Sequence, residues 1–162
     1  TLYFVRHGQT DWNKALRWQG GAADTELNQT GREQAEAVAA YFVTQGFAEP
    51  PLSDSHLRPE YVLSSPLKRA QYTAARIADA LDLQVVTEPA FRELNLGDYE
   101  GKTTPELQLE YGEAFAHWLS RHHQDAPPGG ENLQQGITRM APALRSWIAQ
   151  RQGPLIIVAH QA

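Results

Sequence analysis

Four short segments constrain the fold of this chain more than any other feature. They are runs of mainly apolar residues without polar alternation, which is typical of parallel strands covered on both faces. The segments are Leu2–Val5, Tyr61–Leu63, Gln84–Thr87 and Leu155–Ala159. Helical patterns separate them, and strands that alternate with helices predict an α/β domain. We therefore expect a three-layer α/β/α sandwich around a mostly parallel central sheet.

Amphipathic helices are predicted between these strands. Thr30 and Glu33 have the spacing of a capping box that opens the first helix. Ser65-Pro66 predicts the start of the second, because proline suits the first helical position. The third covers Glu131–Gln152, where Pro142 predicts a kink. Its expected apolar stripe comprises Leu133, Ile137, Ala141, Leu144 and Ile148.

The region between Pro89 and Gly130 is less regular, with short helices expected near Thr104–Leu109 and Glu113–Leu119. We expect it to form a cap that helps to choose the substrate. The candidate cap residues are Trp118, Arg121, His122 and His123, although ordinary surface packing also explains them.

Composition excludes several classes of protein. The 162 residues suggest one domain, and a net charge of −5 gives no electrostatic footprint for nucleic acid. No apolar run approaches the roughly 20 residues of a membrane span. The chain has no cysteine, which excludes disulfides and thiolate metal sites and is compatible with the cytoplasm.

Polar side chains follow the predicted strands at one edge of the sheet, where open α/β sheets bind ligands. Arg6 and His7 follow the first strand, and His160 follows the last. Arg69 lies in the first turn of a helix, where a cation is disfavoured unless an anion or a salt bridge is present. Glu93 lies in a charged loop and is a candidate proton donor.

Together these side chains suit phosphoryl transfer. Guanidinium groups bind phosphate in a bidentate manner, and a neutral imidazole can attack phosphorus. A carboxylic acid can protonate the leaving alcohol and then activate water. Each residue taken alone also has a structural explanation, as a loop histidine, a salt bridge or a solvated carboxylate. We expect no cofactor and no metal, since His122-His123 is the only close histidine pair.

The sequence resembles the histidine phosphatase superfamily, also called the phosphoglycerate-mutase-like family, along nearly its whole length. Arg6-His7-Gly8-Gln9-Thr10 resembles the RHG signature, and Ser64–Ala74 the element S-S-P-x-x-R-A-x-x-T-A. Further matching elements are Arg17–Gly20, Leu27–Ala35, Arg92-Glu93-Leu94 and Pro128-Gly129-Gly130-Glu131.

The resemblance implies a role for each matching position. His7 would be the phosphorylated nucleophile, Glu93 the general acid and base, and His160 the second histidine. The residues implied to bind phosphate or substrate are Arg6, Asn13, Arg17, Gln19, Gly20 and Arg69.

The resemblance favours a phosphomonoester hydrolase of the phosphatase branch. Leu94–Gly101 resembles the form L-x-x-G-x-W-E-G, with Tyr99 in place of tryptophan. A phosphoglycerate mutase is the first alternative, and a non-catalytic phosphate-binding module is the second. The expected partner is a small phosphate ester; the residues fix neither its identity nor the oligomeric state.

The family continues after its second histidine into a helix and often another strand. Here the sequence stops at Ala162, two residues after His160. We therefore expect one histidine phosphatase domain over 1–162 that lacks these last elements, and a natural polypeptide that continues.

Overall fold

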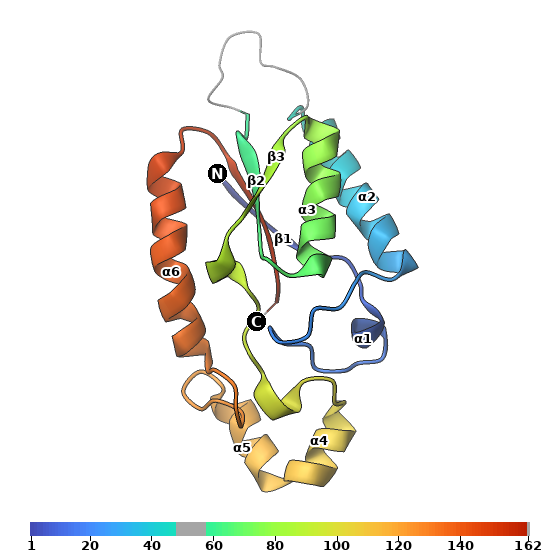
Figure 1. The fold of residues 1–162 in the computed structure, drawn as a ribbon, viewed down its shortest axis with the longest axis vertical. Helices are drawn as coiled ribbons and strands as arrows, with labels where there is room; N and C mark the ends of the chain where they lie inside the picture. Colours follow the sequence, from blue (N-terminus) through green and yellow to red (C-terminus); the bar gives the residue numbers. More distant parts are fainter. Residues whose placement is uncertain (48–57, 162) are drawn as a thin grey trace.

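The predicted apolar segments form the four strands of one parallel sheet (Figure 1). The computed structural model describes residues 1–47 and 58–161, so the expected continuation past Ala162 lies outside the described residues. The strands are β1 (Leu2–Arg6), β2 (Tyr61–Ser64), β3 (Gln84–Thr87) and β4 (Leu155–Ala159), in the order β1-β4-β2-β3. This parallel sheet confirms the predicted architecture.

The register of the sheet aligns the ends of its two central strands and one edge strand. Arg6 pairs with Ala159, and Ser64 pairs with Val158. Because the strands are parallel, the residues that follow β1, β2 and β4 emerge side by side at one edge.

Helices α2 (Gln29–Thr44) and α3 (Lys68–Leu81) cover one face of the sheet (Figure 1). Their small and apolar side chains pack with Val62, Ile156 and Val158 in one buried cluster. The helix residues in this cluster are Ala39, Phe42, Ala70, Ala74, Ile77, Ala78 and Leu81.

Both helices begin at residues other than those predicted. The N-cap of α2 is Asn28, whose side chain accepts a hydrogen bond from the Gly31 amide, so the capping box at Thr30 is wrong. Helix α3 begins at Lys68 rather than Pro66. The Lys68 amide donates to Asp24 at 2.7 Å, so a side chain distant in sequence caps α3.

Helix α6 (Leu133–Gln150) covers the opposite face of the sheet (Figure 1). It runs through Pro142 without ending and is shorter at both ends than predicted. The predicted stripe is partly wrong, since Ile137 and Ile148 are exposed. The side chains that pack on the sheet are Met140, Ala143, Leu144 and Trp147.

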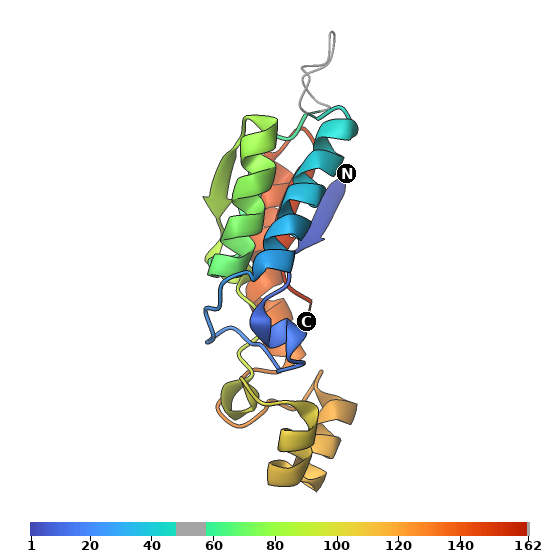
Figure 2. The same ribbon diagram turned by 90° about the vertical axis from the view of Figure 1, so that its right-hand side faces the viewer.

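Three short helices lie at the carboxyl edge of the sheet: α1 (Asp11–Lys14), α4 (Thr104–Tyr111) and α5 (Glu113–Arg121). Figure 2 shows α4 and α5 beyond the end of the sheet. They have their own aromatic cluster of Tyr99, Phe115 and Trp118, separate from the clusters on the sheet. No helix in the described ranges is long and apolar enough to cross a membrane.

Candidate active site

His7 and His160 meet where β1 and β4 end. The amide of His7 donates to the carbonyl of Ala159 at 3.1 Å, which continues the strand pairing by one residue. The two imidazole rings lie 5.1 Å apart between centroids, with 59° between their planes. The predicted pair of strand-end histidines is therefore brought together.

A backbone contact selects the tautomer of His7. Its Nδ1 atom lies 2.7 Å from the carbonyl oxygen of Gly8. A carbonyl only accepts hydrogen bonds, so Nδ1 carries a proton and the neutral ring keeps its lone pair on Nε2. The pKa of His7 is lowered to about 4, chiefly by burial and also by the charges of Arg69 and Arg6, while the Gly8 bond opposes the shift. The Nε2 atom is therefore a free nucleophile near neutral pH.

Gly8 leaves no room for a side chain. A Cβ atom at this position would lie 2.2 Å from the carbonyl oxygen of Gly31 in α2. The Gly8 amide donates to the hydroxyl of Thr73 in α3 at 3.1 Å. Helices α2 and α3 thus hold the backbone that orients His7.

His160 is held by the loop after β2. Its Nε2 atom lies 2.7 Å from the Ser65 hydroxyl. Its Nδ1 atom is buried and has no hydrogen-bond partner among the described residues. Burial, together with the charges of Arg69 and of the neighbouring His7, lowers its pKa to about 2. The ring is therefore neutral near pH 7 and keeps one buried nitrogen without a protein partner among the described residues.

Arg69 is fully buried, and backbone carbonyls fix its guanidinium. Its terminal nitrogens donate to the carbonyls of Ala23 at 2.7 Å and Gly20 at 3.1 Å. Its Nε atom has no partner within the described part of the chain. A fixed, dry guanidinium beside two imidazoles favours an anion at this point.

The carboxylate of Glu100 fixes the same loop from the other side. It accepts hydrogen bonds from the amides of Ala22 at 3.1 Å, Ala23 at 2.8 Å and Leu96 at 3.1 Å. Three charge-assisted bonds from backbone amides make a rigid joint between two loops. Glu100 therefore supports the carbonyls that hold Arg69.

Glu93 lies in the loop that leads from the sheet to α4. Its side chain accepts a hydrogen bond from the Leu94 amide at 2.9 Å. Burial raises its pKa, and this amide together with the charges of Arg69 and Arg6 opposes the rise. A carboxyl group with a raised pKa suits general acid and base catalysis.

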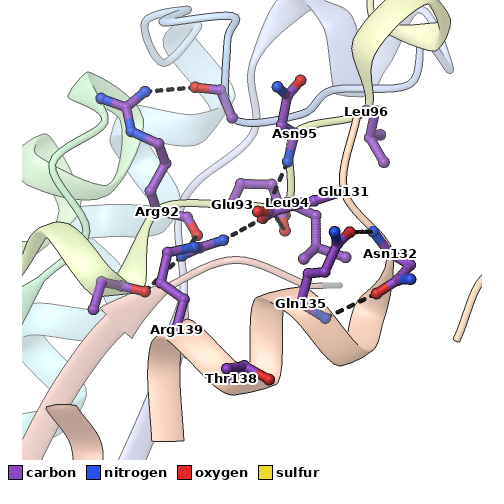
Figure 3. A network of polar contacts seen from close by, with 12 residues as sticks. Arg92, Glu93, Leu94, Asn95, Leu96, Glu131, Asn132, Gln135, Thr138 and Arg139 are labelled. Atoms are coloured by element: carbon purple, nitrogen blue, oxygen red, sulfur yellow. Dashed lines mark hydrogen bonds and ion pairs between the residues drawn. The ribbon is translucent and has the colours of Figure 1, made fainter. Parts of the chain in front are cut away.

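Helix α6 anchors the Glu93 loop (Figure 3). The guanidinium of Arg139 donates to the carbonyls of Ala90 at 2.6 Å and Arg92 at 2.9 Å. It also forms an ion pair with Glu131, whose backbone amide donates to the Asn95 carbonyl at 2.7 Å. The two residues brace the loop on both sides of Glu93.

One cavity of about 970 Å³ opens at this edge of the sheet. Six predicted site residues line it: Arg6, His7, Asn13, Arg17, Gln19 and Glu93. Gly20, Arg69 and His160 are not in its wall, although His160 touches the ring of His7. Of the predicted cap residues, Trp118 and His122 line the cavity, whereas Arg121 and His123 do not.

Three of the predicted substrate contacts already have protein partners. Asn13 accepts hydrogen bonds from the amide and hydroxyl of Thr10, each at 3.0 Å, and so caps α1. The side-chain oxygen of Gln19 lies 2.8 Å from the same hydroxyl, whose single proton the two side chains share. Arg17 pairs with Glu106 at 3.0 Å in α4.

The sequence did not reveal the supporting roles of Thr73, Glu100 and Arg139. Thr73 and Glu100 stand at the T and the E of the family elements in Ser64–Ala74 and Leu94–Gly101, but those elements do not say which backbone groups the side chains contact. Arg139 lies outside both elements. In residues 1–47 and 58–161 no group of three His, Cys, Asp or Glu side chains is placed to hold a metal ion.

Comparison with known proteins agrees with this geometry. The family described as "Histidine phosphatase superfamily (branch 1)" matches residues 2–162. Phosphoserine phosphatase 1 of Hydrogenobacter thermophilus is 34% identical over 98% of this chain and 70% of its own. A protein of Yersinia pestis named "Probable phosphoglycerate mutase GpmB" is 35% identical over 96% of this chain and 67% of its own.

Solved structures give the same result. A mycobacterial glucosyl-3-phosphoglycerate phosphatase has a TM-score of 0.83 and 32% identity over 98% of this chain and 75% of its own. A putative alpha-ribazole-5'-P phosphatase from Escherichia coli has a TM-score of 0.79 and 28% identity over 99% and 73%. These matches confirm the predicted fold and class of activity. The chain belongs to the histidine phosphatase superfamily, branch 1.

Proposed function

We propose that this enzyme hydrolyses a small phosphomonoester through a phosphohistidine formed on Nε2 of His7. The observation that carries the proposal is the Nδ1 contact with the Gly8 carbonyl, because it leaves Nε2 unprotonated on a side chain that lines the cavity. The absence of cysteine from the sequence is compatible with activity in the cytoplasm.

The first step transfers the phosphoryl group to the enzyme. The Nε2 lone pair attacks phosphorus, the bond to the leaving oxygen breaks, and the carboxylic acid of Glu93 gives its proton to that oxygen. Arg6 and Arg69 stabilise the charge on the non-bridging oxygens, and His160, whose ring lies 5.1 Å from that of His7, completes the positions around the phosphoryl group.

The second step regenerates the enzyme. The Glu93 carboxylate takes a proton from a water molecule, whose oxygen attacks phosphorus as the bond to Nε2 breaks. Inorganic phosphate leaves, and His7 returns to its neutral form. The guanidinium groups supply the positive charge in both steps, so we expect turnover to persist in a chelator.

Rapid-quench labelling with a radioactive phosphoester tests this proposal. The wild type should accumulate an acid-labile, base-stable label, and His7→Asn should abolish both the label and turnover. His123→Asn is the matched control, because that histidine is not in the cavity wall. Turnover at the wild-type rate in His7→Asn would overturn the mechanism.

A phosphoglycerate mutase is the second candidate, favoured by the name of the Yersinia pestis relative. A mutase must return the phosphoryl group to a bound acceptor rather than to water. Isomerisation of phosphoglycerate that exceeds its hydrolysis, with and without a bisphosphate primer, would support the mutase. Binding of phosphate without turnover of any ester would instead indicate a non-catalytic module.

A further inference from the structure

The cavity is much larger than a phosphoryl group requires. Its volume of about 970 Å³ corresponds to roughly thirty water molecules, and a phosphoryl group has only four heavy atoms. Arg6 and His7 line the cavity at the end of β1, which we take as its phosphate end. The remaining wall therefore contacts the leaving group and selects the alcohol.

Six large apolar side chains line this remaining wall, together with neutral polar side chains such as Gln9, Gln34 and Gln161. Trp18 and Trp118 pack edge to face, with ring centroids 5.4 Å apart. The Trp18 indole nitrogen donates to Thr104 at 3.1 Å, so its one polar atom already has a partner. The apolar lining residues are Leu16, Trp18, Leu94, Leu96, Trp118 and Leu119.

The charged groups of this wall are already paired. Arg17 is held by Glu106 at 3.0 Å and by the Gly101 carbonyl at 2.6 Å. The carboxylate of Glu131 pairs with Arg139. Within the described ranges, Arg6 is the one lining guanidinium without an ion pair, and it belongs to the phosphate end.

A carboxylate on the leaving group would therefore be poorly matched by this wall. The carboxylate would be desolvated beside indole and leucine side chains. Away from the phosphate end, the described lining has no lysine and no unpaired arginine to form an ion pair with it. Desolvation of an unpaired carboxylate is strongly unfavourable. His122 lines the wall as well, with its Nδ1 bonded to the Leu119 carbonyl at 3.2 Å.

We infer that the preferred substrate is the phosphate ester of an uncharged alcohol with a flat apolar body, seated against Leu16, Trp18, Trp118 and Leu119. The inference rests on the proposed function and goes beyond it by naming the class of leaving group. It disfavours small carboxylated esters such as phosphoglycerate and phosphoserine.

Three primary alkyl phosphates test separately the two properties of the leaving group, its lack of charge and its apolar body. They are 2-phenylethyl phosphate, its analogue with a carboxylate on the ring, and glycerol 3-phosphate. All are esters of primary alcohols, so intrinsic reactivity differs little. We expect kcat/KM for 2-phenylethyl phosphate to exceed that of each of the others at least tenfold.

A positive charge added to the apolar part of the cavity wall should remove the preference for the phenyl ester over the carboxyphenyl ester. Leu119 is 41% exposed and lines the cavity, so Leu119→Lys should fold and place an ammonium group near the leaving group. We expect the ratio of kcat/KM between the phenyl and carboxyphenyl esters to fall at least tenfold. Leu109→Lys is the matched control, since Leu109 is 91% exposed and outside the cavity wall, and its ratio should not change.

The outcomes separate this inference from the proposed function. If the protein hydrolyses neither these three esters nor any other phosphoester, the proposed function itself is refuted. Equal or faster hydrolysis of the carboxylated ester or of glycerol 3-phosphate would overturn the inference alone. A ratio of kcat/KM between the phenyl and carboxyphenyl esters that stays unchanged in both Leu119→Lys and Leu16→Lys would also overturn the inference. If the wild type prefers the carboxylated ester and His122→Gln loses that preference, His122 is the residue that binds the carboxylate.

Discussion

The Nδ1 atom of His7 lies 2.7 Å from the carbonyl oxygen of Gly8, and this contact decides which nitrogen can attack phosphorus. The ring proton lies on Nδ1 and is donated to the Gly8 carbonyl, so no separate base is needed to deprotonate Nε2. Because burial lowers the pKa of His7 to about 4, the nucleophile is present over the whole range above that pH.

The pH dependence of kcat/KM should reflect two groups. On the acidic side, activity should fall near pH 4 as His7 gains a proton. On the alkaline side it should fall as Glu93 loses the proton it donates, at a pH above the ordinary value because burial raises its pKa. We expect an optimum on the acidic side of neutrality, and an acidic limb at pH 6 or above would contradict the assignment of His7.

Glu93→Gln should discriminate between leaving groups. An alkyl phosphate needs a proton on its leaving oxygen, so its rate of phosphoryl transfer should fall by about 10²–10⁴. The nitrophenolate of p-nitrophenyl phosphate leaves without one, so its loss should be much smaller. Single-turnover rates for both esters provide the measurement. Equal losses would remove Glu93 from the role of proton donor.

Glu100→Gln should weaken phosphate binding although Glu100 does not line the cavity. The variant places an NH₂ group against backbone amides that need an acceptor, which should shift the carbonyls that hold Arg69. Small shifts of this kind cost about 10² in rate. We expect kcat/KM to fall and the inhibition constant of inorganic phosphate to rise together. Glu110→Gln, which alters an exposed carboxylate paired with Lys102, should change neither.

The ion pair of Glu131 and Arg139 should contribute to the free energy of unfolding, and Arg139 should also affect the pH dependence of kcat/KM. A double-mutant cycle with Glu131→Gln and Arg139→Gln should give a coupling of about 1 kcal/mol in urea unfolding. The positive charge of Arg139 lowers the pKa of Glu93, so its removal should move the alkaline limb to higher pH. An alkaline limb that stays in place would restrict Arg139 to a structural role.

The buried histidines should make the protein sensitive to acid. The pKa of His160 is about 2 in the folded state against 6.5 when unfolded, so the unfolded chain binds more protons below pH 6.5. Stability is therefore lost as pH falls from 6.5. At pH 5 each histidine should cost about 2 kcal/mol. His160→Gln should remove about half of the loss between pH 7.5 and 5 in urea titrations, and an unchanged loss would contradict it.

The strands and the main site residues could be predicted from the sequence for a shared physical reason. A continuous apolar run identifies a buried strand, and a polar residue directly after it must emerge at the edge of the sheet. Arg6, His7 and His160 were located in this way. Arg69 was a candidate because a cation is disfavoured in the first turn of a helix, and Glu93 because it lies in a charged loop. The resemblance to a known family then gave each of them a role in one site.

Other features depend on contacts between distant segments, which local patterns do not contain. Helix α3 is capped by Asp24, more than forty residues before it, so Pro66 was a misleading start signal. In α6 the packing face includes Trp147, which the predicted stripe lacks and whose indole donates to the distant Glu88 at 2.8 Å. The hydrogen bonds of Glu100 to backbone amides of a distant loop are likewise evident only from the structure.

The aromatic cluster of Tyr99, Phe115 and Trp118 has a consequence for how such enzymes diversify. Because α4 and α5 carry their own small core, substitutions there leave the packing of the sheet untouched. Selection can therefore remodel the wall that meets the alcohol while the nucleophile and its arginine remain in place. One chemical reaction can in this way be redirected to new metabolites, largely by changes in the segment from Glu93 to the start of α6 at Leu133.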